Sequence, residues 1–306
     1  MQRRIGFIGL GAMGKPMAKR LLQAGYEVII SVHCNYTVAD ELVQQGAHLV
    51  DSPAAMVALT DVVITMLPDA PQVEEVCIGP HGLVSEKEIG KALTVIDMST
   101  ISPLATRAIA ARLQEAGIAM LDAPVSGGPW RAETGELTIM VGGDAELFEQ
   151  HRTLLSVLGS NIVHVGPIGH GEIVKMANNM IAGMLMPVLS EALTLGVKAG
   201  VDLPTLYKVI CMSSGRNYML EQWLPKTLFR ERFDDGFALE LLRKDLGIAL
   251  EMGRELDVPL HEAGLAYQLF TQAKGLGYGR EDFSAVSKLY QQAANINIVT
   301  GETVRS

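Results

Sequence analysis

The sequence predicts an α/β domain with a doubly wound parallel sheet in the first half of the chain and an all-α domain in the second half. Residues 1–123 alternate short apolar runs with amphipathic stretches, which is typical of parallel βαβ units. A turn of the form G-x-G-x-x-G joins the first run to the first amphipathic stretch. After residue 166 the strand-like runs end and long helical patterns follow. We therefore expect two domains, residues 1–165 and 166–306.

Each element of the first domain is predicted by its apolar period. Short apolar runs predict strands at residues 4–8, 27–32, 62–66, 94–97 and 119–122, with further strands at 137–141 and 162–165. Apolar residues at helical spacing predict helices at residues 15–24, 38–45, 72–78, 104–115 and 145–158.

The second domain shows only helical patterns. The longest, residues 171–199, is apolar around most of its circumference, which indicates a helix buried on several sides. Its stretch 180–189 is short and contains Pro187, so it predicts a buried helix segment and no membrane span. Further helices are predicted at residues 204–212, 217–228, 237–256, 260–274 and 283–295.

The overall composition excludes several classes of protein. The chain has 306 residues, 48% apolar and 19% charged, which fits a globular protein with two cores. Its net charge of −9 argues against a nucleic-acid binder, yet leaves room for a small anionic substrate. The three cysteines are widely spaced and match no metal-ligand or disulfide pattern. We expect buried, reduced thiols and a cytoplasmic protein without a metal.

The glycine turn is a candidate dinucleotide site. Gly9 permits the tight turn, Gly11 lets the backbone approach a pyrophosphate, and Gly14 lets helix and strand pack closely. The helix that follows directs its N-terminus towards the anion. The predicted cofactor-binding residues of this turn are Gly9, Leu10, Gly11, Ala12, Met13 and Gly14.

The end of the second strand should distinguish NAD from NADP. An acid there binds the ribose hydroxyls of NAD, and an arginine accepts the phosphate of NADP. This chain has neither, but His33 and Asn35 can form hydrogen bonds with either cofactor. The missing carboxylate slightly favours NADP, and both cofactors stay open.

Residues that follow the next parallel strands should face the ligand crevice. These are Met66, Leu67 and Pro68 after one strand and Thr100 after another. The Ser99–Thr100 pair can contact the nicotinamide or cap the helix that begins near Pro103, and the two roles are compatible.

Two further segments carry chemistry. Residues 122–128 form a glycine-rich loop whose backbone N–H groups and Ser126 hydroxyl can hold an anion or simply make a turn. Lys175 lies on an apolar helix face, where burial would lower the pKa of a lysine towards a value suited to proton transfer. Asn179 lies one turn further along the same face. A lysine that extends to solvent at a helix start is the alternative.

Four motifs together resemble the β-hydroxyacid dehydrogenase family over nearly the whole chain. The turn from Gly9 to Gly14 resembles its cofactor motif, residues 122–128 its substrate motif and residues 171–179 its catalytic motif. The triplet at Lys244 resembles its cofactor-side motif. The resemblance implies a Rossmann domain, an all-helical domain, and a homodimer or homotetramer formed through the helical domain.

The resemblance also implies the chemistry. It predicts reversible hydride transfer between NAD(P) and a short 3-hydroxy acid or its aldehyde acid. Lys175 would act as general acid or base, and Asn179 would orient the reacting oxygen. Ser126, Gly127 and Gly128 would hold the substrate carboxylate. Thr100 and Lys244 would face the nicotinamide.

Arg131 departs from many members of the family, which carry glycine at this position. Tartronate semialdehyde reductases often have a basic residue here, so tartronate semialdehyde is the expected substrate and Arg131 a substrate-binding residue. The segment Gly279 to Ser284 is more similar to 3-hydroxyisobutyrate and sulfolactaldehyde enzymes. Those two activities and succinic semialdehyde reduction remain alternatives. Lys175 argues against an imine reductase, and the Lys175–Asn179 pair against a non-catalytic nucleotide sensor.

Overall fold

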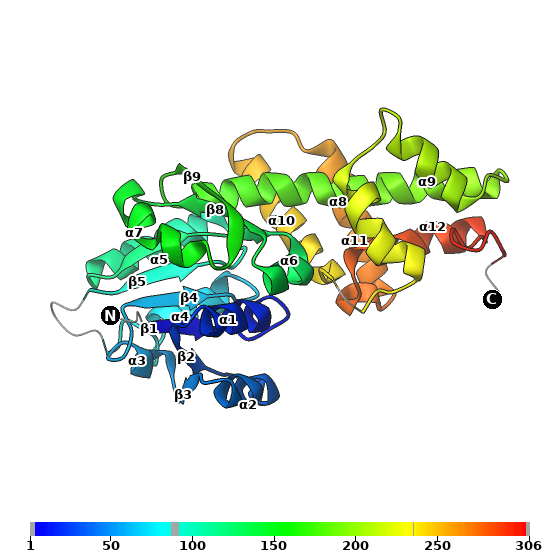
Figure 1. Cartoon of the computed structure of the whole chain (residues 1–306). Helices are drawn as coiled ribbons and strands as arrows, with labels where there is room; N and C mark the ends of the chain where they lie inside the picture. The colour runs from blue at the N-terminus through cyan, green and yellow to red at the C-terminus, as the bar shows by residue number, and fades with distance from the viewer. Residues whose placement is uncertain (1–3, 87–91, 235, 304–306) are drawn as a thin grey trace. The chain divides into compact units, whose positions relative to one another are not determined.

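The computed structural model of the chain describes residues 4–86, 92–234 and 236–303. The chain forms two compact units, Met1–Lys175 and Met176–Ser306. Helix α8 (His170–Lys198) begins in the first unit and continues in the second. Figure 1 shows the sheet at the blue and green end of the chain and helices throughout the rest. The domain boundary expected between residues 165 and 166 remains a prediction.

A mixed sheet with a parallel main part forms the first unit. Six parallel strands lie in the order β3-β2-β1-β4-β5-β6: β1 (Arg4–Ile8), β2 (Glu27–Ser31), β3 (His48–Val50), β4 (Val62–Thr65), β5 (Thr94–Asp97) and β6 (Ala119–Asp122). β8 (Leu137–Gly142) pairs antiparallel with β6 and with β7 (Val125–Ser126), and β9 (Gly159–Gly166) pairs parallel with β8. The predicted doubly wound α/β fold is confirmed, with antiparallel pairing added at one end.

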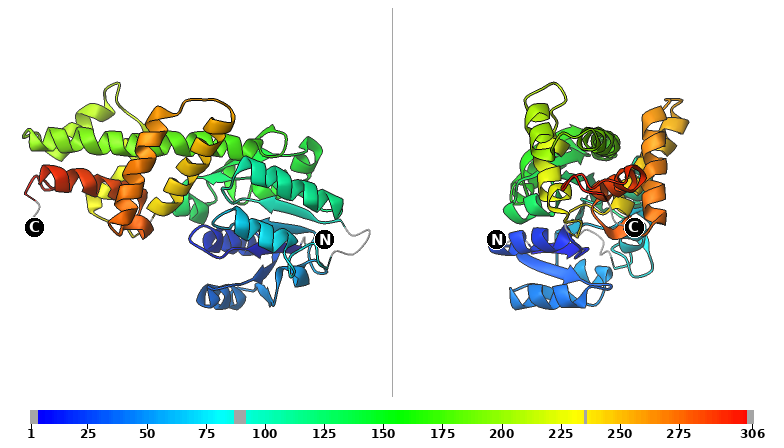
Figure 2. Two further views of the ribbon diagram at one scale, coloured as in Figure 1. Left: turned by 180° about the vertical axis from the view of Figure 1, so that it is seen from behind. Right: turned by 90° about the vertical axis from the view of Figure 1, so that its right-hand side faces the viewer.

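Helices cover both faces of the sheet. Since alternate residues of a strand point to opposite faces, each strand contributes side chains to two cores. Ile5 and Phe7 of β1 share one core with Met17 of α1, whereas Ile8 shares the other with Cys77 of α4. Figure 2 shows the two helical layers from behind and from the side. The helices of this unit are α1 (Gly14–Gln23), α2 (Tyr36–Gln44), α3 (Pro53–Met56), α4 (Ala70–Ile78), α5 (Pro103–Glu115), α6 (Gly128–Thr134) and α7 (Ala145–Leu155).

The second unit is helical, as predicted. Glycines let its helices approach closely: an added Cβ at Gly183 of α8 would lie 3.1 Å from Leu246, and at Gly196 2.6 Å from Leu206. The α-helices that follow α8 are α9 (Leu203–Cys211), α10 (Leu239–Glu255), α11 (His261–Gly275) and α12 (Ser287–Ala294). Short 3₁₀ helices are η2 (Leu224–Lys226), η3 (Leu228–Arg230), η4 (Tyr278–Arg280) and η5 (Phe283–Val286).

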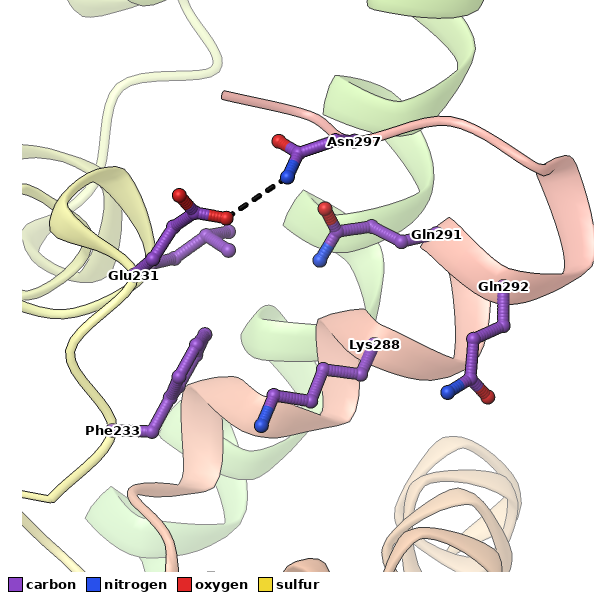
Figure 3. A pocket seen from close by; sticks show the side chains of 7 residues that line it. Glu231, Phe233, Lys288, Gln291, Gln292 and Asn297 are labelled. Carbon is purple, nitrogen blue, oxygen red and sulfur yellow. Dashed lines mark hydrogen bonds between the residues drawn. The ribbon is translucent and has the colours of Figure 1, made fainter. Parts of the chain in front are cut away.

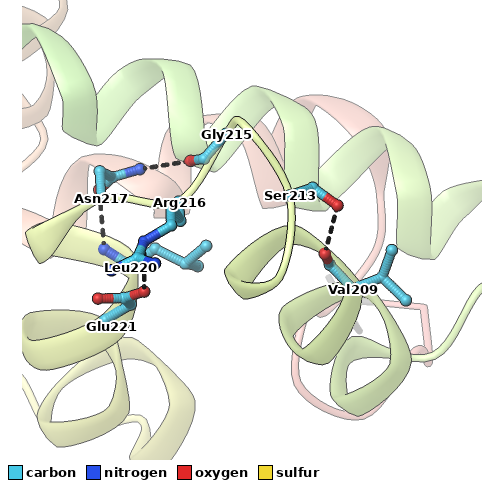
Figure 4. Close-up of polar contacts among 7 residues, drawn as sticks. All are labelled: Val209, Ser213, Gly215, Arg216, Asn217, Leu220 and Glu221. Carbon is cyan, nitrogen blue, oxygen red and sulfur yellow. Dashed lines mark hydrogen bonds and ion pairs between the residues drawn. The ribbon is translucent and has the colours of Figure 1, made fainter.

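One predicted helix, residues 217–228, is a series of shorter turns. A π-helix, η1 (Met219–Trp223), comes first, and η2 and η3 follow it. The Asn217 side chain starts this segment, since its Oδ1 accepts from Leu220 N at 3.0 Å and its Nδ2 donates to Gly215 O at 3.0 Å (Figure 4). Pro225 lacks an N–H group, so a regular α-helix could not continue through it.

Other elements were missed by the sequence analysis because they are short. β3, α3, β7 and α6 have two to seven residues, too few to show a clear period. The loop expected at residues 122–128 is in fact a two-residue strand followed by the start of α6. The predicted helix at residues 283–295 is η5 followed by α12.

Helix α8 was expected to be a buried helix and no membrane span. Helix α8 is long and apolar enough to cross a membrane by length and composition, but half of its most apolar window is buried inside the structure. Core helices of globular proteins pass the same criterion.

The three cysteines are free thiols. The expectation that all are buried is wrong, because Cys34 is exposed after β2 and Cys211 is half-buried.

Candidate active site

The glycine turn after β1 has the geometry that a dinucleotide loop requires. Gly9 has a φ of 103°, and an added Cβ there would lie 2.1 Å from Met66 O. An added Cβ at Gly14 would lie 1.7 Å from Gly9 O. At Gly11, by contrast, an added Cβ would meet no atom within 4 Å. Two glycines are therefore required by packing, and the third presents bare backbone to open space, as the close approach of a pyrophosphate would require.

The segment after β2 is joined to this turn. The Asn35 side-chain Nδ2 donates to Leu10 O at 3.1 Å, and His33 is exposed nearby in sequence. Leu10 is buried, whereas Ala12 is exposed and Met13 half-buried. The bond leaves the Asn35 carbonyl oxygen as an acceptor for a hydroxyl donor.

The segments after β4 and β5 are tied to each other. Leu67 N donates to Ser99 Oγ at 2.9 Å, and Met66 N donates to Ile8 O at 2.8 Å. Pro68 is exposed and Thr100 half-buried at the same end of the sheet, because β4 and β5 are adjacent and parallel. The predicted cofactor-binding residues of the first unit thus lie along the carboxyl edge of the sheet, as expected for a ligand crevice.

The candidate substrate segment combines a strand end with a helix start. Ser126 pairs with Thr138 of β8, Gly127 has a φ of 137°, and Gly128 begins α6. An added Cβ at Gly127 would lie 2.8 Å from Arg131 Cδ. The aliphatic part of Arg131 therefore lies against the Gly127 backbone, one turn further along the chain.

Lys175 is buried, as its apolar surroundings in the sequence predicted. It lies in the second turn of α8 and is 8% exposed. The start of this helix is bound by Asp122 at the end of β6: Oδ1 accepts from Gly169 N at 2.7 Å, and Oδ2 accepts from Glu172 N at 3.0 Å. In the sequence Asp122 is visible only as the first residue of a glycine-rich loop, so its role at the start of α8 was not predicted.

In the second unit, Asn179 and Lys244 share a partner that the sequence analysis did not single out. Asn179 is 4% exposed, and its Nδ2 donates to Asp245 Oδ2 at 2.6 Å. Lys244 Nζ lies 3.1 Å from Asp245 Oδ1. Asn178 Nδ2 donates to Asn179 Oδ1 at 3.1 Å. Asp245 precedes an apolar run on α10, and that pattern was the available signal for a buried, paired carboxylate.

A separate cavity in the second unit does not involve the predicted site residues. It has a volume of about 160 Å³ and is lined by Leu228, Glu231, Phe233, Lys288, Gln291, Gln292 and Asn297 (Figure 3). Its polar side chains already have partners: Asn297 Nδ2 donates to Glu231 Oε1 at 2.9 Å, Gln291 Oε1 accepts from Ile298 N at 2.9 Å, and Gln292 Nε2 donates to Tyr278 OH at 2.8 Å. Lys288 Nζ forms an ion pair with Glu281.

Comparison with known proteins agrees with this geometry. Residues 4–166 match the family model described as the NAD binding domain of 6-phosphogluconate dehydrogenase. Residues 169–290 match the model described as NAD-binding of NADP-dependent 3-hydroxyisobutyrate dehydrogenase. Together the two models cover most of the chain.

Individual relatives cover nearly the full length. The chain is 44% identical to 2-(hydroxymethyl)glutarate dehydrogenase of Eubacterium barkeri, over 98% of each chain. It is 37% identical to 2-hydroxy-3-oxopropionate reductase of Escherichia coli, over 95% of this chain and 98% of that one. A structure of Mycobacterium tuberculosis 3-hydroxyisobutyrate dehydrogenase with L-serine has a TM-score of 0.85 at 30% identity, over 94% and 99% of the two chains.

The relatives, the matched models and the dinucleotide turn point to one chemistry, the NAD(P)-dependent oxidation of a hydroxyl group on a small hydroxy acid. The chain belongs to the β-hydroxyacid dehydrogenase family and is an NAD(P)-dependent 3-hydroxyacid dehydrogenase.

Proposed function

We propose that the chain interconverts a short 3-hydroxy acid bearing a second polar or anionic group with its aldehyde acid, and that tartronate semialdehyde is its substrate. The observation that carries the proposal is a buried lysine, Lys175, followed one helical turn later by a buried asparagine, Asn179, on α8. A lysine is buried at such cost only where it is paired or used.

Lys175 supplies the proton in this proposal. In the reductive direction its ammonium group protonates the alkoxide oxygen that forms, and in the oxidative direction the neutral amine accepts the hydroxyl proton. Asn179 orients the same oxygen, and its amide is held by Asp245 and Asn178. Ser126, Gly127 and Gly128 bind the substrate carboxylate. When bound, the nicotinamide cofactor supplies or accepts the hydride at its C4 carbon.

The cofactor is held by the glycine turn and by residues of the strand ends. Gly11 fits this role because its backbone faces open space. The remaining residues proposed to bind the cofactor are Gly9, Leu10, Ala12, Met13, Gly14, His33, Asn35, Met66, Leu67, Pro68, Thr100 and Lys244. The missing acid after β2 slightly favours NADP over NAD.

Arg131 selects the substrate in this proposal. Its stem lies against Gly127, so its guanidinium group is within reach of a second group on a substrate held by residues 126–128. A guanidinium group offers planar donors to a hydroxyl or carboxylate. Tartronate semialdehyde carries such a hydroxyl, whereas methylmalonate semialdehyde carries a methyl group.

A second candidate substrate is 2-(hydroxymethyl)glutarate. Identity to the enzyme named for it is 44%, against 37% to 2-hydroxy-3-oxopropionate reductase. Its second carboxylate would also suit Arg131. The hydroxyl and carboxylate that react are arranged as in the other 3-hydroxy acids, so the roles of Lys175 and Asn179 are the same for both substrates.

Turnover across a substrate panel with both cofactors tests the proposal. The panel contains tartronate semialdehyde, 2-(hydroxymethyl)glutarate, 3-hydroxyisobutyrate, sulfolactaldehyde and succinic semialdehyde. We expect the highest kcat/KM for tartronate semialdehyde. A higher kcat/KM for 2-(hydroxymethyl)glutarate would make that compound the substrate, and the reaction class would stay the same. Cofactor binding without turnover of any member would support a nucleotide sensor instead.

We also propose a cytoplasmic homodimer or homotetramer. Three apolar residues of α8 in the second unit, Ile181, Val188 and Leu195, are spaced by seven and 54–72% exposed. A seven-residue spacing puts them on one helix face, which a second copy could bury. Sedimentation measures the oligomeric state of the wild type and of Val188→Glu. A monomeric wild type, or a variant that still forms the wild-type oligomer, would contradict an interface on this helix face.

A further inference from the structure

Two buried carboxyl groups lie side by side at the carboxyl edge of the sheet. Asp97 ends β5 and Asp122 ends β6, and the two residues are register partners on adjacent parallel strands. Both are 0% exposed. In-register residues of parallel strands direct their side chains to the same face. Two negative charges in such a site would repel each other with little water to screen them.

Asp122 has the surroundings of an ionised carboxylate. Both of its oxygens accept backbone N–H groups from the start of α8, those of Gly169 and Glu172. An added Cβ at Gly171 would lie 2.7 Å from Asp122 Oδ2, so only glycine lets the helix approach this carboxylate. The first N–H groups of a helix lack partners and form the positive end of its dipole, which stabilises a negative charge there. Burial still raises the pKa of Asp122, and these bonds oppose that rise.

Asp97 has different surroundings. Its Oδ1 accepts from Thr65 Oγ1 at 2.8 Å and from Ser99 N at 3.1 Å. Within the described residues no hydrogen bond reaches its Oδ2, which is fully buried. A neutral hydroxyl left in that position costs far less free energy than a buried oxygen that carries charge.

The charged and titratable neighbours of Asp97 agree with a neutral acid. Burial raises the pKa of Asp97 most, the negative charge of Asp122 raises it further, and the Ser99 and Thr65 bonds lower it. Among the described residues Cys77 of α4 is also a titratable neighbour, and burial raises the pKa of its thiol, so it remains neutral. Neither neighbour supplies a positive charge that would stabilise an ionised Asp97.

We propose that Asp97 and Asp122 form a buried carboxyl pair that carries one proton, which resides on Asp97. Asp122 is ionised, binds the start of α8 and so positions Lys175. Neutral Asp97 joins the ends of β4 and β5 through Thr65 and Ser99, and Ser99 in turn binds Leu67 N. Both are positioning residues. The expected effect on catalysis rests on the proposed function of Lys175, whereas the protonation of Asp97 does not.

Infrared spectroscopy tests the proton directly and needs no turnover. At pH 7 the absorption band of protonated carboxylic acids should be stronger in the wild type than in Asp97→Asn by the intensity of one carboxyl group. The control Asp40→Asn, which alters an exposed carboxylate on α2, should keep the band. A wild-type minus Asp97→Asn difference spectrum that shows a carboxylate band instead would overturn the proposal.

The pH dependence of stability gives a second test. A carboxyl group whose pKa is raised in the folded state adds stability that is complete below its unfolded pKa and is lost as pH rises through the folded value. Wild-type Tm should therefore fall with rising pH across this window more steeply than the Tm of Asp97→Asn, which cannot titrate. Parallel curves would contradict a protonated Asp97.

Kinetics separates the two positioning roles. Asp122→Asn should lower kcat about ten- to a hundredfold, because a small displacement of α8 displaces Lys175, while the cofactor Kd changes little. Asp97→Ala should raise the cofactor Kd, and Asp97→Asn should recover most of that loss because the amide has the shape of the neutral acid. Equal Kd values in Asp97→Asn and Asp97→Ala would refute the role of Asp97. If Lys175 proves not to be catalytic, the infrared result still stands on its own.

Discussion

The two compact units of this chain hold their buried polar groups in different ways. In the first unit, strand ends supply them, and Asp122 and Asp97 accept mostly backbone and hydroxyl donors from adjacent segments. In the second unit, side chains from separate helices bind each other, as Asn179 binds Asp245. The position of these residues at the strand ends follows from the strand pattern, so a sequence can predict it, although it does not reveal partners that lie far along the chain. The second depends on how helices pack, which a single sequence does not reveal.

The largest effect should come from Lys175, which belongs to the first unit. Lys175→Ala should lower turnover about 10²–10⁴-fold, because a positioned proton donor is lost. Cofactor affinity should stay close to that of the wild type. The matched control is Lys198→Ala, an exposed lysine at the other end of α8. Steady-state kinetics and cofactor titration measure both; a variant that retains near-normal kcat would show Lys175 to be structural.

The same difference explains what the sequence could predict. The strands β5 and β6 and the glycine turn were predicted with the bounds that the structure has, because buried strands and G-x-G-x-x-G turns have local patterns. Asp122 was not predicted as the partner of the α8 start, since Glu172 lies 50 residues further along the chain. Asp245 was missed for a similar reason.

The second unit also shows where helical periodicity misleads. Residues 217–228 have helical spacing, yet Pro225 and the Asn217 turn divide them into η1, η2 and η3. The partner of this segment lies far along the chain, because Trp223 Nε1 donates to Asp282 Oδ1 at 3.1 Å. Tertiary contacts therefore override local propensity at this point.

Substitution of Asp282 tests its long-range contact with the segment 217–228. Its carboxylate accepts from Trp223 Nε1, Phe237 N at 2.9 Å and Ser284 N at 3.0 Å. Asp282→Ala leaves these buried donors without their acceptor and should lower the free energy of unfolding by about 3 kcal/mol. Asp234→Ala removes only an exposed ion pair with Arg232 and should cost about 0–1 kcal/mol. Urea unfolding of the two variants compares them; equal losses would mean that the Asp282 bonds contribute no stability.

Arg131 tests whether the first unit also selects the substrate. A substrate with a methyl group would leave the guanidinium desolvated, at a cost of a few kcal/mol. Arg131→Gly should therefore lower kcat/KM for tartronate semialdehyde about tenfold or more relative to methylmalonate semialdehyde. Arg131→Met keeps an aliphatic stem against Gly127 and should give the same change in preference, which separates charge from packing. The same factor of change for both substrates would favour a surface arginine near Glu133.

The smallest effect concerns the choice between NAD and NADP, which depends on the segment after β2. No arginine, lysine or acid stands at residues 32–39, and the nearby Lys15 forms an ion pair with Glu41 at 2.6 Å. The Asn35 side chain is held by Leu10 O, so its carbonyl oxygen can accept from a ribose hydroxyl without repelling a phosphate. We therefore expect usable rates with both cofactors and a modest preference for NADP, less than about tenfold in kcat/KM, or about 1.4 kcal/mol.

Asn35→Asp sharpens this prediction, because a carboxylate in that position would repel the 2′-phosphate of NADP while it still accepts from the ribose of NAD. The ratio of kcat/KM for NADPH to that for NADH should fall in the variant, whereas Asp40→Asn, further along α2, should leave it unchanged. A wild-type preference for NAD above about a thousandfold, equivalent to about 4 kcal/mol, would contradict the expectation. It would mean that an acid outside residues 32–39 reaches the ribose.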